Sequence, residues 1–230
     1  MRRRFFKKNN NNNNNNDDKN NVINNNNDQE ILYERKLILT TNKPSKKLKI
    51  ICKHLRMLLR PHSLYKMKEF NIPIKDVIKD SEELSVAHII YCMENKLIIG
   101  DRKEKVSYYF DLVEYENNFK MFKDFYYKDS PFVKIYYNRN DMTDDQIEID
   151  KELSKVFEKF GTVESKLKDF KRLLQIFFEN GLIYIRHYCY SIEDVESNFK
   201  VSLREIGPRF TLKFIKKEEN LLKEFVKKNK

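Results

Sequence analysis

Apolar positions recur along this chain with two different spacings, which predict alternating strands and helices. In residues 45–60 the apolar side chains lie three or four positions apart, as in an amphipathic helix that ends before Pro61. Residues 86–93 and 106–115 are short apolar or alternating runs, typical of strands. The remaining elements that we expect are strands over 37–41, 97–100, 132–137, 173–178, 182–190 and 210–216, and helices over 74–84, 118–127, 143–160 and 218–228.

Two local signals mark where expected elements begin and turn. Thr143 and Gln146 have the spacing of a capping box, with acidic residues in the first turn that favour the helix dipole. Asn180 followed by Gly181 is the dipeptide that best predicts a tight hairpin turn. By period alone residues 168–179 also fit a helix, but the turn favours a strand. Strands alternate with helices, which favours an α/β fold.

The first 30 residues differ from the rest of the chain. Residues 9–27 are almost all Asn and carry little apolar area to offset the conformational entropy of ordering them. We therefore expect residues 1–30 to form a disordered, basic and Asn-rich segment. The start, MRRRFFKK, lacks an apolar signal-peptide core, which favours an intracellular protein, and its cations fit a nuclear address or a nucleic-acid tether.

Several kinds of site are not expected. Cys52, Cys92 and Cys189 are odd in number and widely spaced, so we expect buried thiols rather than a disulfide framework. The sequence has only four glycines and contains no P-loop, paired CxxC or HExxH pattern. No apolar run approaches the roughly 20 residues of a membrane-spanning helix. We therefore predict no cofactor, no metal, no membrane contact and no small-molecule substrate.

An enzyme is the weaker hypothesis. His187 and Cys189 lie two positions apart on a predicted strand and so share a face, which makes a Cys-dependent hydrolase conceivable. The sequence shows neither an orienting group nor an oxyanion loop for such a pair. We expect His54 and His88, which lie in apolar segments, to be structural.

The charge of the chain, +11 in total, is divided into zones. Residues 43–75 hold ten Lys and Arg against one acid, and residues 199–217 hold six against one. Residues 141–164 instead hold eight acids and three lysines. Two basic zones on one folded unit indicate a surface that faces a polyanion, and RNA is the partner that we favour.

Lys and Arg on a helix and its following loop contact phosphates and give affinity without sequence choice. Tyr65, between these cations, fits either a stack on an unpaired base or the core. The residues that we predict to bind RNA are Lys53, Arg56, Arg60, His62, Lys66, Lys68, Arg186, Arg204, Arg209 and Lys213.

Five stretches give the sequence a family resemblance. EIGPRFTLKF, residues 205–214, closely resembles the E-[IL]-G-P-R signature of Brix-domain proteins, which are ribosome assembly factors. SVAHI, residues 85–89, is similar to that family's "GVTHF" strand. The stretches that most resemble the Peter Pan (Ssf) branch of the family are LRMLLRPHSLYKMKE (55–69), IRHY (185–188) and TLKFIKKEE (211–219).

The resemblance covers roughly residues 36–219 and implies both a fold and a function. It implies a Brix domain over 31–219, built of two pseudo-symmetric α/β halves that resemble anticodon-binding domains, roughly 36–140 and 141–219. Residues 220–230 are expected to form a C-terminal helix. In the signature, Glu205, Gly207 and Pro208 are expected to shape the backbone.

The function implied is non-enzymatic: binding of pre-rRNA during assembly of the large (60S) ribosomal subunit, with support of pre-rRNA processing, in the nucleus and nucleolus. The implied partners are pre-rRNA and the assembly factors and ribosomal proteins of pre-60S particles. The sequence departs from the family at Glu83 and Leu84, where relatives have Gly-Pro, and at residues 102–105, which replace "GPT". The alternative is another Brix-branch factor that acts mainly as a protein-interaction scaffold.

Overall fold

The computed structural model describes residues 35–41, 43–64, 74–116, 127–138, 143–163, 171–195 and 198–222. The chain divides into two units, residues 1–32 and 33–230, and every described residue belongs to the second. The prediction for residues 1–30, and that for a helix over 118–127 except its last residue Tyr127, therefore lie outside the described residues.

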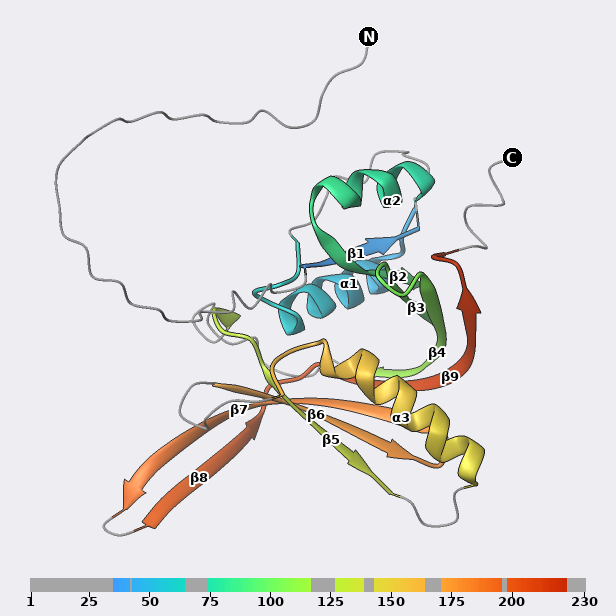
Figure 1. The fold of residues 1–230 in the computed structure, drawn as a ribbon. Helices are drawn as coiled ribbons and strands as arrows, with labels where there is room; N and C mark the ends of the chain where they lie inside the picture. The colour runs from blue at the N-terminus through green and yellow to red at the C-terminus, as the bar shows by residue number, and fades with distance from the viewer. Residues whose placement is uncertain are drawn as a thin grey trace, which may run out of the picture. The chain divides into compact units, whose positions relative to one another are not determined.

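Three helices and nine strands make up the described part of the chain (Figure 1). The helices are α1 (Lys46–Leu58), α2 (Ile74–Glu83) and α3 (Asp144–Glu158). The strands are β1 (Arg35–Thr40), β2 (Val86–Met93), β3 (Lys96–Asp101), β4 (Val106–Glu116), β5 (Phe132–Tyr137), β6 (Arg172–Glu179), β7 (Leu182–Val195), β8 (Asn198–Glu205) and β9 (Arg209–Glu219).

The strands form one sheet that repeats the same topology twice. Its order is β1-β2-β3-β4-β9-β7-β6-β5, and β8 pairs with β7 beside this path. In the first half β1 and β2 are parallel and joined through α1 and α2, and β3 and β4 follow antiparallel. In the second half β5 and β6 are parallel and joined through α3, and β7 and β9 follow antiparallel. The topology confirms the predicted α/β class with two related halves.

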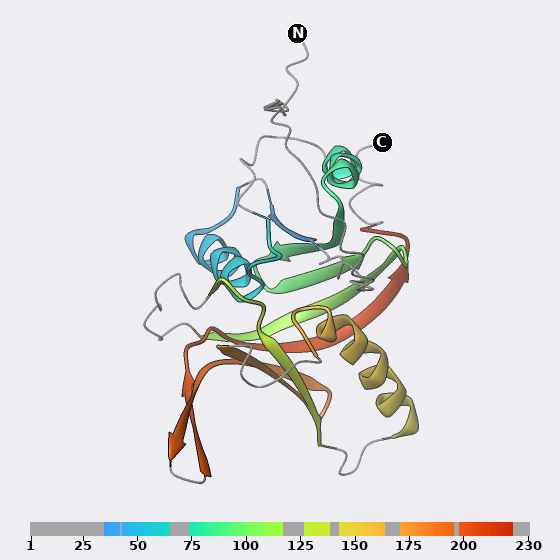
Figure 2. The ribbon, with the colours of Figure 1, turned by 60° about the vertical axis from the view of Figure 1, so that its left-hand side comes forward.

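The two halves meet through their last strands. β4 and β9 run antiparallel from the pair Val106 and Glu219 to the pair Glu116 and Arg209, and they lie side by side in Figures 1 and 2. This pairing makes the two short sheets continuous, so each half is fixed by backbone hydrogen bonds to the other.

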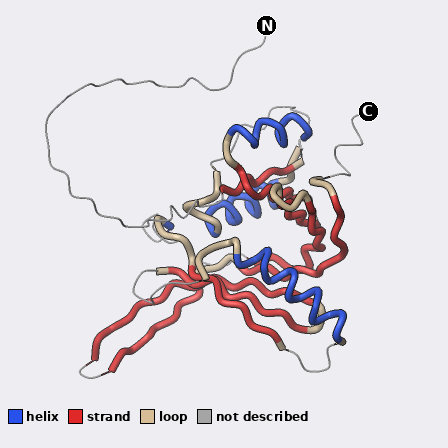
Figure 3. The backbone as a smooth tube through the Cα atoms, in the orientation of Figure 1, coloured by secondary structure: helices blue, strands red, loops and turns tan. Residues whose placement is uncertain are grey.

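Helices α1 and α3 lie on one face of the sheet, which we call the inner face, and bury it (Figure 3). The predicted stripe of α1 is confirmed, because its apolar residues join one core with those of α3. Each helix begins at a side-chain cap: Ser45 Oγ accepts a hydrogen bond from the Leu48 amide, and Thr143 Oγ1 from the Gln146 amide. The buried residues of the two helices include Leu48, Ile51, Leu55, Leu58, Leu153, Val156 and Phe157.

The opposite face of the sheet, the outer face, is treated differently in the two halves. In the first half it carries a second core, where Ile74, Val77 and Ile78 of α2 pack against the sheet. The strand residues of that core are Leu37, Leu39, Val86, Ile89, Tyr91, Ile98 and Tyr109. In the second half α3 lies on the inner face, and the outer side chains of β5 and β6 are exposed or half-buried.

The predicted hairpin between β6 and β7 is confirmed. Asn180 and Gly181 have φ angles of 52° and 71°, so both turn residues adopt the left-handed conformation of a type I′ turn. Glu179 and Leu182 form the last cross-strand pair. The strand reading of residues 173–178, favoured over a helix, is therefore right.

Near the end of the chain, the predicted start of one helix was wrong and one strand was not predicted. The helix expected over 218–228 does not begin where predicted, because β9 continues to Glu219 by pairing with β4. Asn220 and Leu222 follow in a turn, and the Leu222 amide donates to Ser107 Oγ at 2.9 Å. Residues 223–230 lie outside the described part. Strand β8 was not predicted, and its hairpin with β7 projects from the sheet in Figure 1.

Candidate nucleic-acid interface

A buried arginine joins the two halves of the domain. Arg172, the first residue of β6, is only 1% exposed. Its guanidinium donates to three backbone carbonyl oxygens, those of Leu58 at 3.2 Å, Arg60 at 2.7 Å and Asp129 at 2.6 Å. Tyr127 adds a ring 5.0 Å from the guanidinium carbon. Burial lowers the pKa of Arg172 to about 10, so the group stays charged at neutral pH and its charge is solvated by these carbonyls.

The same arginine fixes a buried histidine. His187 is fully buried; its Nδ1 lies 2.8 Å from the Gly207 carbonyl and its Nε2 lies 3.4 Å from Arg172 Nη1. A carbonyl only accepts and a guanidinium only donates, so the arrangement selects neutral His187 with its proton on Nδ1. Burial, and then the charge of Arg172, lower the pKa of His187 to about 3. The amides of Ile206 and Gly207 return bonds to the His187 carbonyl at 2.9 and 3.2 Å.

Beyond this turn Arg209 closes an ionic clasp. Its Nε and Nη2 donate to the two carboxylate oxygens of Glu205, each at 2.7 Å, and its Nη1 donates to Glu116 at 2.9 Å. Gly207 between them has a φ of 55°, which costs glycine little. The bonds to Glu205 raise the pKa of Arg209. Arg209 was predicted to bind RNA; the structure gives it two intramolecular carboxylates, and its contact with RNA stays a prediction.

The other predicted RNA residues of the first half lie on α1 and just after it. Lys53 is exposed, whereas Arg56 is half-buried and donates from Nη2 to the Ile38 carbonyl at 2.7 Å. Arg60 is half-buried, and His62 pairs with Ser130 through Nε2. Burial, and then the charges of Lys36 and Arg172, lower the pKa of His62 to about 4. Tyr65, Lys66 and Lys68 lie outside the described residues.

In the second half the predicted residues divide between the two faces of the sheet. Lys213 is exposed on the outer face, opposite Leu182 of β7. Arg186 is on that face too, with its Nη1 bonded to the carbonyls of Ile185 and Phe210. Arg204 is exposed on β8 opposite Cys189, which faces inward. The ten residues therefore do not form a single patch.

The chain matches a known protein family, and its fold matches solved structures. Residues 41–216 match the Brix domain. The chain belongs to the Brix-domain family. This Brix domain is similar in structure to a probable ribosomal biogenesis protein from Aeropyrum pernix K1, with a TM-score of 0.50 and 10% identity over 78% of this chain and 96% of that one. It also matches Mil, an archaeal Imp4-like protein, with a TM-score of 0.40 and 12% identity over 81% and 100% of the two chains. No curated protein sequence matches this chain.

Three of the stretches that carry the Brix resemblance meet around Arg172. The carbonyls of Leu58 and Arg60 belong to LRMLLRPHSLYKMKE, His187 belongs to IRHY, and Gly207 belongs to EIGPR. Sequence reasoning did not single out Arg172. A signal was present: Arg172 has the parity of Leu174, Ile176 and Phe178, which are buried, so the alternation of β6 places it on the inner face.

The Cys-dependent alternative gains nothing from the geometry. Both ring nitrogens of His187 face other partners, and burial raises the pKa of Cys189, which keeps the thiol protonated. His54 and His88 are buried, as expected, and none of the three cysteines forms a disulfide. Within the described ranges, no group of three or more His, Cys, Asp or Glu could hold a metal ion. No helix among the described residues is long and apolar enough to cross a membrane.

Replacing Arg172 should be strongly destabilising. Arg172→Leu removes a buried side chain that donates to three backbone carbonyls, and we expect the free energy of unfolding to fall by roughly 3 kcal/mol. Lys171→Met is the matched control, because Lys171 pairs with Asp129 at the surface and should change it by less than about 1 kcal/mol. Urea denaturation at pH 7 measures both, and equal effects would contradict the role of Arg172.

Stability should also fall with acid in a defined window. The pKa of His187 is about 3 in the folded chain against 6.5 unfolded, so only the unfolded chain takes up its proton as pH falls below 6.5. The contribution of His187 to the free energy of unfolding is complete above pH 6.5, and it decreases by up to about 1.4 kcal/mol for each pH unit below that value. His54 and His62, whose pKa values are also lowered, act in the same direction. In urea titrations from pH 7 to 5, His187→Gln should flatten this dependence; an unchanged slope would refute the assignment.

The clasp predicts that charge alone does not replace Arg209. Arg209→Lys keeps the charge but loses the two-pronged bond to Glu205, so it should lower the free energy of unfolding by about 1 kcal/mol, nearly as much as Arg209→Ala. Thermal denaturation measures this loss. A lysine variant as stable as the wild type would show that geometry is unimportant. RNA titrations of the folded Arg209→Ala variant test whether Arg209 contacts RNA. An unchanged affinity would exclude that contact.

Proposed function

We propose that this chain is a non-enzymatic ribosome assembly factor that binds pre-rRNA during assembly of the large (60S) ribosomal subunit and supports pre-rRNA processing. Membership of the Brix-domain family supports the role in ribosome biogenesis. The resemblance of residues 55–69, 185–188 and 211–219 supports the Peter Pan branch. The partners that we propose are pre-rRNA and the assembly factors and ribosomal proteins of pre-60S particles, and the proposed location is the nucleolus.

The observation that carries RNA binding is the exposed face of α1. Lys46, Lys49 and Lys53 lie within one helical stripe and are all exposed, and α1 contains no acidic residue. We call these three lysines the α1 basic face. Three ammonium groups on a fixed helix fit adjacent phosphates of a folded RNA, and the release of counterions supplies the free energy.

The related helix of the second half sharpens this observation. Helix α3 occupies the same place between two parallel strands as α1 does, yet its exposed residues include Asp144, Asp145, Glu148 and Glu158. The same architecture therefore carries opposite charges. Packing needs only the buried stripe of each helix, so the basic exposed face of α1 is explained by a polyanionic partner rather than by the fold.

A scaffold role has its own support. The exposed acids of α3 fit a basic segment of another protein. Val201 and Leu203 of β8 are 51% and 54% exposed, which is unusual for apolar side chains side by side on a strand. In a pre-ribosomal particle both roles can operate together, through different surfaces of this domain. Crosslinking within purified particles separates them, because a scaffold crosslinks chiefly to protein.

RNA affinity should depend on salt and on the α1 basic face. For a structured rRNA fragment, log K should fall linearly with log salt. Lys49→Glu with Lys53→Glu removes two phosphate contacts, so the slope should become shallower by roughly 1.5 and affinity should fall for many RNA sequences alike. Fluorescence anisotropy titrations between about 50 and 300 mM KCl, which bracket physiological salt, measure the affinity and its salt slope.

The matched control is Lys151→Glu with Lys155→Glu on α3. These lysines are also exposed and also one helical turn apart, so the change in net charge is the same. We expect this control to leave the salt slope of the wild type intact. Salt-independent affinity of the wild type, or equal losses in both double variants, would overturn the proposal that α1 binds RNA.

A further inference from the structure

The outer face of the second half is the place where the two halves differ most. Counted from the start of equal-length strands, Leu37 and Leu39 of β1 correspond to Lys134 and Tyr136 of β5. Ile89 and Tyr91 of β2 correspond in the same way to Gln175 and Phe177 of β6. Through the strand pairings, Ile98 and Gly100 of β3 correspond to Tyr184 and Arg186 of β7. In the first half the outer face is mainly aliphatic and is covered by α2, whereas the corresponding surface of the second half is aromatic and basic.

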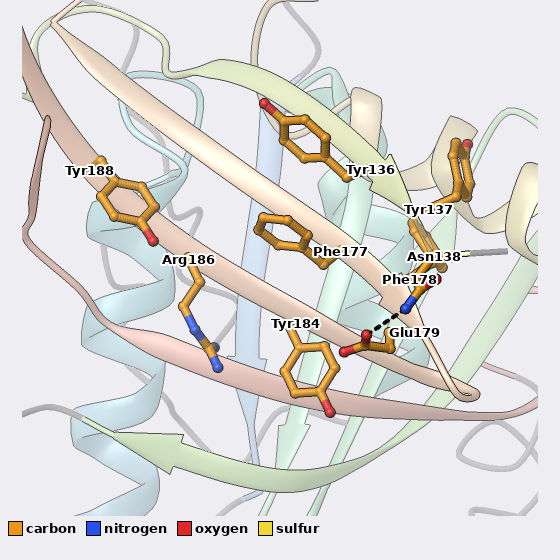
Figure 4. A pocket seen from close by; sticks show the side chains of 9 residues that line it. All are labelled: Tyr136, Tyr137, Asn138, Phe177, Phe178, Glu179, Tyr184, Arg186 and Tyr188. Atoms are coloured by element: carbon orange, nitrogen blue, oxygen red, sulfur yellow. Dashed lines mark hydrogen bonds between the residues drawn. The ribbon is translucent and has the colours of Figure 1, made fainter. Parts of the chain in front are cut away.

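This second surface is open. Tyr136 is 39% exposed, Lys134 is exposed, and Phe177, Tyr184 and Arg186 are half-buried. Tyr136, Phe177, Tyr184, Arg186 and Tyr188 are among the residues that line a hollow of about 510 Å³ (Figure 4). Among the described elements, α2 alone packs on the outer face, and it does so in the first half.

The aromatic side chains are arranged as a layer. The rings of Tyr136 and Phe177 are stacked, with centroids 4.9 Å apart and planes 16° apart. Tyr184 is the cross-strand partner of Phe177, and the guanidinium of Arg186 lies 5.5 Å from the Tyr184 ring. Figure 4 shows these side chains and Tyr188 along neighbouring strands. We call Tyr136, Phe177, Tyr184, Arg186 and Tyr188 the aromatic platform.

We propose that the aromatic platform binds unpaired bases of single-stranded RNA, a deepening that rests on the proposed RNA-binding function. Every base offers a flat π-face that stacks on aromatic rings and on arginine, and each stacked base contributes about 1–3 kcal/mol. Exposed Lys134 and Lys213 flank the platform on β5 and β9, where they reach the phosphates on either side. From β5 to β9 the platform is roughly 14 Å wide, three strand spacings.

The polar positions favour RNA over a protein helix. A partner helix in the place that α2 takes in the first half would desolvate Lys134, Gln175 and Arg186, which replace Leu37, Ile89 and Gly100. Burying such groups without new partners is costly. A nucleotide instead offers a phosphate and base edges to the same groups. The platform therefore fits RNA better than an apolar helix stripe.

Carboxylates near the platform are already engaged, which limits their repulsion of phosphate. Glu205 and Glu116 both bind Arg209, so the single positive charge of the clasp offsets one of their two negative charges at the edge of the outer face. Glu114 accepts from the Thr211 hydroxyl, and Glu179 accepts from Asn138 at 2.8 Å. Arg209 of the Brix signature thereby reduces the negative charge beside the platform.

A tryptophan reporter tests the platform directly. The chain contains no tryptophan, so Tyr136→Trp gives one fluorophore on the platform. Titration with a single-stranded ten-nucleotide RNA should quench its emission as a base stacks on the indole, and a blunt-ended RNA duplex, which has no unpaired bases, should not. Val163→Trp is the control, because Val163 is also exposed, at 46%, but follows α3. Absent quenching at RNA concentrations that saturate anisotropy would overturn the proposal.

Affinity gives the second test. Tyr136→Ala with Tyr184→Ala should weaken binding of the ten-nucleotide RNA by about tenfold or more, whereas both Tyr→Phe changes should retain it. Binding of the duplex RNA and its salt slope should stay as in the wild type, because they depend on α1. Full affinity of the alanine variant refutes the platform while the proposed function stands. A wild type that binds neither RNA refutes both. If the alanine variant binds RNA as the wild type does but no longer binds a pre-ribosomal protein, the surface is a protein-docking face and the platform is refuted.

Discussion

The burial of one positive charge organises this domain. Arg172 lies in the core, where an unsolvated guanidinium would be very costly, and three carbonyl oxygens from two distant chain segments replace water. Those carbonyls are available only when the end of α1 and the segment around Asp129 are in place. Arg172 also selects the neutral form of His187, which in turn holds the Gly207 carbonyl. A single side chain thus ties the first half, the connection and the final turn of the second half together.

The domain uses one architecture twice and decorates it in opposite ways. Both halves bury the inner face under one helix, yet α1 presents lysines and α3 presents acids to solvent. The outer face is an apolar core under α2 in one half and an aromatic surface in the other. Packing constrains only the buried side chains, so the exposed ones are free to differ. Differences between related halves are therefore better guides to binding than features that both halves share.

Much of the fold could be predicted from the sequence because its signals are local. The stripe of α1, the Thr143 cap and the turn at Asn180 depend on residues a few positions apart. The helix expected from residue 218 was wrong because pairing with β4, more than a hundred residues away, extends β9 to Glu219. β8 was missed although residues 199–204 alternate apolar and polar as a strand does, and the structure leaves Val201 and Leu203 of this strand exposed.

The candidate site was predicted only in part, since a sequence shows a charge but not its partner. Arg56 and Arg209 have the same charge as Lys53, yet one binds a backbone carbonyl and the other two carboxylates, while Lys53 stays exposed. Arginine is the cation best suited to such two-pronged internal bonds, whereas lysine remains solvated. In this domain Arg56 and Arg209 therefore hold internal partners, and the RNA contacts that we propose are assigned to exposed lysines and to the aromatic platform. A signature that identifies the family can for this reason lie beside the binding surface rather than in it.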